Sequence, residues 1–162
     1  MKRDRPGLGQ ESVWDYPRPP QVEAEPRFVR IVLGGETIAT TDRALRVLET
    51  SHPPGIYLPP DAFLAGSLSP NPQRTVCEWK GLAEYWDLKG GEAQKAAAAW
   101  SYPEPRPGFE AIAGYLSVYP GRVDACYLGE ELVRPQEGSF YGGWITDEIV
   151  GPFKGAPGTA GW

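Results

Sequence analysis

Glycine and proline are the residues that most limit what this chain can fold into. Its 162 residues include 20 Gly and 18 Pro, more than a fifth of the total. Glycine weakens helix and strand interiors, and proline removes a backbone donor and breaks helices. This composition favours many turns and short elements over long helices. The six Trp and eight Tyr supply large rings for such a fold to bury, so the sequence predicts a β-rich domain.

Length, charge and cysteine content narrow the class of protein. A chain of this length suits one domain with a real core. The net charge of -5 lacks the basic excess that phosphate neutralisation requires, so we expect no nucleic-acid partner. No apolar run matches a membrane span or a signal peptide, which predicts no membrane partner and a cytoplasmic location. In such a reducing compartment Cys77 and Cys126 are expected to be free thiols.

Within the single domain we expect three parts. Residues 1–24 form an extended N-terminal arm, residues 25–135 a β-rich core, and residues 136–162 a Gly/Pro-rich extension packed on the core. Trp14 and Tyr16 are alternate residues of the proline-rich arm, so both rings are expected to face one surface and fill an apolar groove. The alternative is that they wall a ligand pocket.

The clearest element is a hairpin in which residues 27–33 and 36–41 are strands joined by Gly34-Gly35. Alternation places Val29, Ile31 and Leu33 on one face and Phe28, Arg30 and Val32 on the other, and the more apolar face should meet the core. Residues 42–48 fit either helical turns or a strand, and their context favours a strand.

Later elements follow from turn residues. Residues 69–72 contain two prolines and are expected to be a loop, and residues 74–88 form one strand with a bend near Gly81. Residues 96–99 can begin as a helix but must be extended by Tyr102, which precedes proline. Short helical turns over 107–114, a strand over 115–119 and a hairpin over 123–133 complete an all-β, mostly antiparallel fold.

Several segments together resemble a known family. They are Ser12-Val13-Trp14-Asp15-Tyr16-Pro17, Arg46-Val47-Leu48-Glu49-Thr50-Ser51-His52-Pro53-Pro54, Tyr57-Leu58-Pro59, Cys77-Glu78-Trp79-Lys80-Gly81, Ala98-Ala99-Trp100-Ser101-Tyr102-Pro103, Val118-Tyr119-Pro120, Tyr141-Gly142-Gly143-Trp144-Ile145 and Gly151-Pro152-Phe153-Lys154-Gly155. The chain resembles, over nearly its whole length, the family called domain of unknown function 427, which also carries a nucleotidyltransferase-like label. The resemblance implies a compact all-β domain, either a tent-like β fold or a small open barrel, without a settled activity. Nucleotidyltransferases need paired acidic metal ligands and a Gly-rich phosphate cradle, and the sequence has neither.

The stretch from Glu49 to Pro60 holds the only histidine, His52. Imidazole exchanges protons near neutral pH, and Pro53 and Pro54 restrict the backbone around it. We therefore propose His52 as a catalytic acid or base, with Glu49 orienting its ring. The alternative is a structural histidine that anchors the loop by a hydrogen bond.

A second cluster is Cys77-Glu78-Trp79-Lys80. If the strand is regular, Cys77 and Trp79 share one face and Glu78 and Lys80 the other. Cys77 is a candidate nucleophile whose thiolate His52 or Lys80 would stabilise, and Lys80 could bind an anion. The alternative is a buried core cysteine beside a surface ion pair. The chain has no paired-cysteine turns, and a tetrahedral zinc site built on Cys77, Cys126 and His52 would need a carboxylate as well, so we expect no metal and no cofactor.

Aromatic residues are the candidates for pocket walls. Rings with polar tips suit either a dense core or a ligand pocket, and Gly142-Gly143 lets backbone approach closely. The ligand-binding set predicted from the sequence is Tyr57, Glu78, Trp79, Tyr102, Tyr141 and Trp144. Core filling is the alternative for most of the rings.

These clusters predict a domain that binds a small molecule of unidentified chemistry in an aromatic-lined pocket rimmed by Glu49, His52, Glu78 and Lys80. A small enzyme using His52, with Cys77 as nucleophile, is one alternative. A non-catalytic interaction or structural domain is another, and a homodimer is left open.

Overall fold

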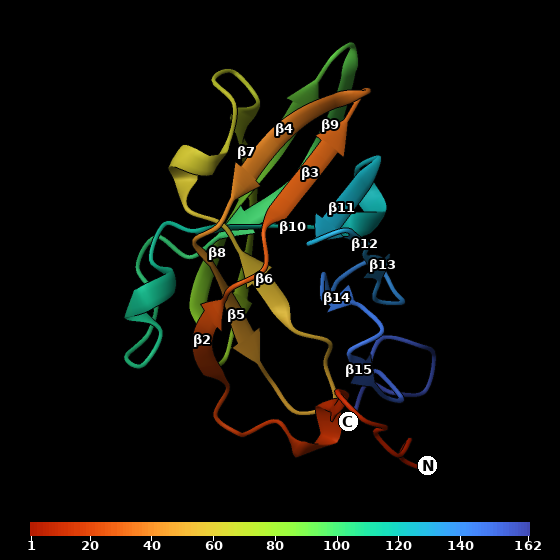
Figure 1. Ribbon diagram of the computed structural model, residues 1–162. Coiled ribbons are helices and arrows are strands. Elements are labelled where there is room, and N and C mark those ends of the chain that lie inside the picture. The colour runs from red at the N-terminus through yellow and green to blue at the C-terminus, as the bar shows by residue number, and fades with distance from the viewer.

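The computed structural model describes residues 1–162 and is all-β, as predicted (Figure 1). Its only helical segments are three-residue 3-10 turns: η1 (Val13–Asp15), η2 (Pro60–Ala62), η3 (Glu110–Ile112) and η4 (Pro120–Arg122). The strands are β1 (Glu11–Ser12), β2 (Gln21–Glu25), β3 (Val29–Leu33), β4 (Glu36–Thr41), β5 (Ala44–Leu48), β6 (Gly55–Tyr57), β7 (Leu68–Cys77), β8 (Gly81–Gly90), β9 (Ala93–Ser101), β10 (Leu116–Val118), β11 (Ala125–Leu128), β12 (Glu131–Leu132), β13 (Arg134–Pro135), β14 (Trp144–Ile145) and β15 (Ile149–Val150). No helix is long and apolar enough to cross a membrane.

One sheet has the strand order β12-β11-β3-β4. It contains the predicted hairpin, because β3 and β4 pair antiparallel around Gly34-Gly35. Its apolar face is the one that alternation predicted: Val29, Ile31 and Leu33 are fully buried. The predicted hairpin between β11 and β12 is also present.

A second and a third sheet meet at one point, and β1 with β15 and β13 with β14 form two small two-stranded sheets. The second sheet has the order β10-β9-β8-β7 and the third β2-β5-β6, which confirms a strand over residues 44–48. Just after β6, Leu58 and Leu116 exchange two backbone hydrogen bonds of 2.8 Å. This bridge joins the two sheets edge to edge and brings β5 and β6 beside the long strands β8 and β9.

The loop predicted at residues 69–72 is wrong, because these residues belong to the ten-residue strand β7. β7 lies at the edge of its sheet, and its pairing with β8 shifts register between Asn71 and Arg74. Proline cannot donate to a ladder, but an edge strand has one unpaired side and a bulge relaxes the pairing further. Pro70 and Pro72 are therefore tolerated within the strand.

The single bent strand predicted over residues 74–88 is also wrong. The chain reverses at Glu78–Lys80, where Cys77 pairs with Gly81, and β7 and β8 form a hairpin. Gly81 has a φ of 111°, a conformation that side chains other than glycine rarely adopt. Glycine thus marks a reversal of the chain and not a bend within one strand.

Two further predictions of local structure are corrected. The alanine run at residues 96–99 lies inside strand β9 and forms no helix, because pairing with β8 and β10 outweighs the helix preference of alanine. Trp14 and Tyr16 do not lie on an extended chain, since η1 turns the backbone there. Tyr16 is buried, and Trp14 meets the ring of Trp162 edge to face at 5.4 Å. The division of the chain into three parts stays a prediction.

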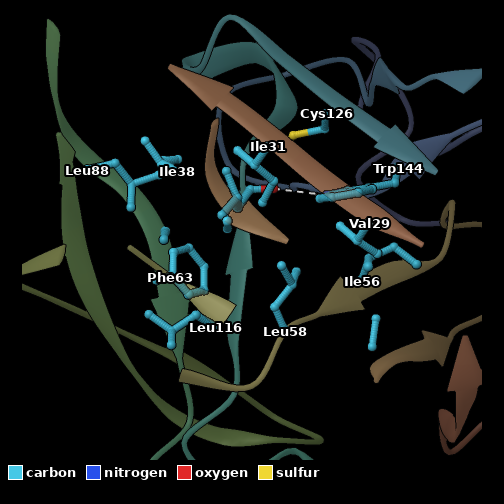
Figure 2. Close-up of a cluster of buried hydrophobic side chains, with 14 of the residues drawn as sticks. Val29, Ile31, Ile38, Ile56, Leu58, Phe63, Leu88, Leu116, Cys126 and Trp144 are labelled. Atoms are coloured by element: carbon cyan, nitrogen blue, oxygen red, sulfur yellow. Dashed lines mark hydrogen bonds between the residues drawn. The ribbon is translucent and has the colours of Figure 1, made fainter. Parts of the chain in front are cut away.

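The main core lies between the first two sheets and strand β6. Figure 2 shows Val29 and Ile31 of β3 facing Ile56, Leu58 and Leu116 across it. At one end the hairpin tips of β3–β4 and β8–β9 pack backbone against backbone: a Cβ on Gly90 would lie 2.3 Å from the carbonyl oxygen of Leu33. A second buried cluster, rich in Tyr and Trp, lies among β5, β6, β8 and β9.

Candidate functional site

A cavity of about 300 Å³ opens beside the aromatic cluster. Its wall draws on five regions of the chain: the stretch from Val47 to Tyr57, the β7–β8 hairpin, strand β9 with Tyr102 just after it, Tyr119 after β10, and the segment from Gln136 to Lys154. It is lined by Val47, Glu49, His52, Pro53, Gly55, Tyr57, Thr75, Val76, Cys77, Glu78, Trp79, Lys80, Tyr85, Trp100, Tyr102, Tyr119, Gln136, Phe140, Tyr141, Gly142, Gly143 and Lys154.

The structure brings together all the predicted site residues except Trp144. Those that line the cavity are Glu49, His52, Tyr57, Cys77, Glu78, Trp79, Lys80, Tyr102 and Tyr141. Trp144 is 1% exposed and lies in the main core, where its indole N–H donates to the carbonyl of Val118 at 3.0 Å (Figure 2). The prediction of Trp144 as a pocket wall fails because the two glycines before it carry the chain from the cavity into the core.

A tight turn places Glu49 and His52 side by side. The backbone N–H of His52 donates to the carbonyl of Glu49 at 3.0 Å, and Ser51 between them has a φ of 72°. Both ends of the chain hold this turn: Ser51 donates its N–H to Val13 and accepts from the N–H of Lys154. Spacing alone did not guarantee contact between the two side chains, and this turn provides it.

The hairpin turn at Glu78–Lys80 directs Lys80 into the cavity. A loop that follows β9 holds the turn from behind: Arg106 donates its backbone N–H to Lys80 and its guanidinium to the carbonyl of Glu78. Lys80 is 8% exposed, whereas Glu78 is exposed to solvent. Since these residues form a turn, the predicted strand alternation between them does not apply. Lys80 is the inner charge, and Glu78 lies at the mouth.

Glu49 stands between two donors. One carboxylate oxygen lies 3.5 Å from Nε2 of His52 and the other lies 3.5 Å from Nζ of Lys80. Burial acts to lower the pKa of Lys80, but the neighbouring Tyr57, Glu49 and Cys77 outweigh it, so this pKa is raised above the ordinary lysine value. Lys80 therefore remains an ammonium at neutral pH.

The hydrogen bonds of Gln136 determine which nitrogen of His52 carries the proton. The side-chain oxygen of Gln136 accepts from the N–H of Gly143 at 3.0 Å, so its nitrogen is the donor end. That nitrogen donates to the carbonyl of Lys154 at 2.6 Å and lies 3.3 Å from Nδ1 of His52. Nδ1 is thus an acceptor, and in the neutral ring the proton lies on Nε2, facing Glu49.

The imidazole is neutral at physiological pH. Burial lowers the pKa of His52 to about 4, Glu49 opposes the shift, and Lys154, Lys80 and Arg18 add to it. The ring also meets Tyr141 edge to face, with centroids 4.8 Å apart. A neutral His52 thus presents its Nε2 proton to Glu49, and the catalytic roles predicted for these two side chains stay a prediction.

The aromatic walls hold most of their polar tips in internal hydrogen bonds. The indole N–H of Trp100 donates to the hydroxyl of Tyr57 at 3.4 Å, and the hydroxyl of Tyr119 donates to the carbonyl of Phe140 at 2.9 Å. Burial raises the pKa of both Tyr57 and Tyr102, so both are neutral phenols. The cavity thus combines apolar ring surface with one ionised pair.

Sequence reasoning did not place Gln136 or Lys154 in the site, because Gln136 lies in an irregular segment and Lys154 stood only within residues 151–155 of the family resemblance. A signal near Gln136 was Gly142-Gly143. A Cβ on Gly142 would lie 2.4 Å from the Trp100 ring, and one on Gly143 would lie 2.7 Å from the side-chain oxygen of Gln136. These glycines let the backbone form a wall of the cavity.

Cys77 and Cys126 are both free thiols, as predicted, but only Cys77 lines the cavity. Cys126 is 1% exposed, and burial raises the pKa of its thiol. No group of three or more His, Cys, Asp and Glu side chains is placed to hold a metal ion.

Fold and site together define a small all-β domain with a buried aromatic cluster. The chain belongs to the family described as domain of unknown function (DUF427), also labelled NTP_transf_9, whose model matches residues 21–129. A comparison with curated proteins found no match. The matched range includes Glu49, His52, Cys77 and Lys80, while Gln136, Tyr141 and Lys154 lie beyond it.

Proposed function

We propose that this domain binds a small organic molecule in the cavity beside Glu49 and Lys80. The observation that carries the proposal is the ionised pair itself, since Lys80 is 8% exposed and its counter-charge lies 3.5 Å away. Withdrawing two charges from water costs several kcal/mol, and apolar replacements of such pairs are often more stable. A pair kept beside an open, ring-lined cavity is better explained by ligand recognition than by stability.

The rest of the cavity supports the same proposal. Its volume of about 300 Å³ is at the lower end of the usual range for small-molecule sites. Tyr, Trp and Phe supply eight of its 22 lining residues, and polar and charged side chains lie among them, as in sites that bind and orient small organic compounds. The held geometry of Glu49 also means that little ordering would remain to be done on binding.

A thermal-shift screen with a broad metabolite panel tests this function. A true ligand should raise the melting temperature of the wild-type protein, since it binds the folded state only. The same compound should have little effect on the Lys80→Met and Glu49→Gln variants. A panel without any stabilising compound, or shifts that are the same in both variants, would refute the proposal.

A second candidate is a small enzyme with Cys77 as nucleophile. In its favour, Cys77, Lys80 and Glu49 line one cavity, and Cys77 is among the neighbours that raise the pKa of Lys80. His52 would orient Glu49 in such an enzyme, because both its ring nitrogens already face protein partners. Iodoacetamide tests this candidate: the thiolate displaces iodide, and Cys77 should be alkylated much faster than buried Cys126. Equally slow labelling of the two cysteines would count against it.

A further inference from the structure

The pair of Glu49 and Lys80 is incompletely satisfied by the protein. Ordinary charge-assisted hydrogen bonds are about 2.7–2.9 Å long. Both partners of the Glu49 carboxylate lie at 3.5 Å, and the same 3.5 Å contact is the only ion pair that Lys80 makes. An ammonium has three donors and a carboxylate about four acceptor sites. Each group therefore has capacity left for a ligand.

The unused hydrogen-bond donors of Lys80 lie next to the unused acceptor sites of Glu49. Lys80 offers donors, Glu49 offers acceptors, and 3.5 Å separates their charged atoms. The complementary ligand edge carries an acceptor beside a donor. The pair is neutral as a whole, so a neutral edge leaves it intact, whereas a zwitterion would bring two further charges into a buried site.

The surrounding rings select a flat molecule. Nζ of Lys80 lies 5.9 Å from the centroid of the Tyr102 ring, so this ring flanks the charged pair. Tyr57 and Trp100 form an edge-to-face pair beside it, with centroids 6.3 Å apart. Flat ring surfaces pack best against a planar, largely apolar body.

We propose that the cavity recognises a planar cyclic amide, whose ring N–H donates to Glu49 and whose adjacent carbonyl oxygen accepts from Lys80. A cyclic amide holds its N–H and carbonyl on the same edge, as the pair requires. His52, held by Gln136, lies beside the second carboxylate oxygen of Glu49, so a ligand that also contacts Lys80 meets the other oxygen. This inference rests on the proposed binding function and names the ligand class.

Oxindole, a flat two-ring cyclic amide, is a suitable probe. N-methyloxindole replaces the N–H donor by a methyl group and keeps the carbonyl, indane removes both polar groups, and free phenylalanine supplies the zwitterion. Binding is followed by two-dimensional amide NMR of the full chain. We expect oxindole to shift the amide signals of Lys80, Gly81 and Gly143, and N-methyloxindole to bind about tenfold or more weakly. In Lys80→Met and Glu49→Gln proteins, oxindole binding should weaken by a similar factor.

The outcomes distinguish a failure of the cyclic-amide inference from a failure of the proposed small-molecule binding. Equal binding of oxindole and N-methyloxindole at the cavity, or tighter binding of phenylalanine, overturns the cyclic-amide inference and leaves small-molecule binding in place. If none of the four probes shifts any cavity signal and the metabolite screen also fails, both proposals fall. The unchanged signals of distant residues such as Cys126 show that each variant is folded.

Discussion

Burial lowers the pKa of the His52 ring to about 4, and both of its nitrogens face protein partners. Nδ1 of His52 faces the amide of Gln136, and Nε2 faces Glu49. The group in the cavity that is ionised and oriented, with acceptor capacity left, is therefore the carboxylate of Glu49. At the scale of single residues, the structure shifts the centre of interest from His52 to Glu49 and Lys80.

The protonation of His52 can be measured directly, because it is the only histidine of the chain. We expect nitrogen-detected NMR of the ring at neutral pH to show the tautomer with its proton on Nε2, and titration to give a pKa of about 4. In a Gln136→Leu protein the donor to Nδ1 is lost, so the tautomer preference should weaken. A ring that titrates at the ordinary value of 6.5 would contradict this arrangement.

The same pKa predicts a pH dependence of stability. Because the folded-state pKa of about 4 lies below the ordinary 6.5, the unfolded chain binds more protons between these values. The free energy of unfolding should therefore fall as the pH drops through this window, by roughly 3 kcal/mol from His52 alone. Urea unfolding of wild-type and His52→Asn proteins at both ends of the window isolates this contribution. An identical loss of stability in the two proteins would show that other groups cause it.

Some residues of the site could be predicted from the sequence. The only histidine, the prolines after it and the cluster of Cys77 and Lys80 directed attention to side chains that do share one cavity. The tautomer of His52 was out of reach, because it depends on Gln136, which lies 84 residues along the chain. Trp144 was misplaced because the sequence does not show where a chain passes from a cavity into a core.

Among the elements, the hairpin tips of β3–β4 and β8–β9 make a contact that only glycine permits. Gly90 carries no positive φ, so its restriction is purely steric: a Cβ would lie 2.3 Å from the carbonyl oxygen of Leu33 and 2.7 Å from the Ile38 side chain. Both obstacles belong to the first sheet. The contact therefore fixes how closely the two sheets approach.

We expect Gly90→Ala to lower the free energy of unfolding by about 1–3 kcal/mol, because the packed hairpins must separate. Gly121→Ala is the matched control, since its added Cβ would come no closer than 3.6 Å to any neighbour. Chemical denaturation of the two proteins measures the difference. Equal stabilities would mean that the hairpin tips are not in contact.

Strands with a clear alternation of side chains could be predicted from the sequence. Strands that depend on their neighbours in a sheet could not. The alternation in β3 and the Gly34-Gly35 turn predicted one hairpin correctly, because local pattern and burial agree there. Prolines suggested a loop where β7 runs, since sequence does not reveal that a strand lies at a sheet edge. The alanine run of β9 is a strand because its neighbours β8 and β10 hold it.

At the scale of the whole molecule, the segment beyond the family match completes two structures at once. Residues after 129 supply Gln136, Tyr141 and Lys154 to the cavity and Trp144 to the main core. The two termini are tied together nearby, since the indole N–H of Trp14 donates to the carbonyl of Pro152 at 2.9 Å (Figure 1). Cavity and core thus depend on chain that the family model does not cover.

Trp144 and Phe140 belong to the same segment, and we expect their truncation to alanine to have very different effects on stability. Trp144 is 1% exposed and packs in the core, whereas Phe140 is 57% exposed at the cavity mouth. Trp144→Ala should destabilise the protein by about 3–5 kcal/mol through lost burial and the void left behind. Phe140→Ala should change stability by less than about 0.5 kcal/mol. Similar losses for the two variants in urea unfolding would contradict this placement, since burial is the feature that distinguishes the two side chains.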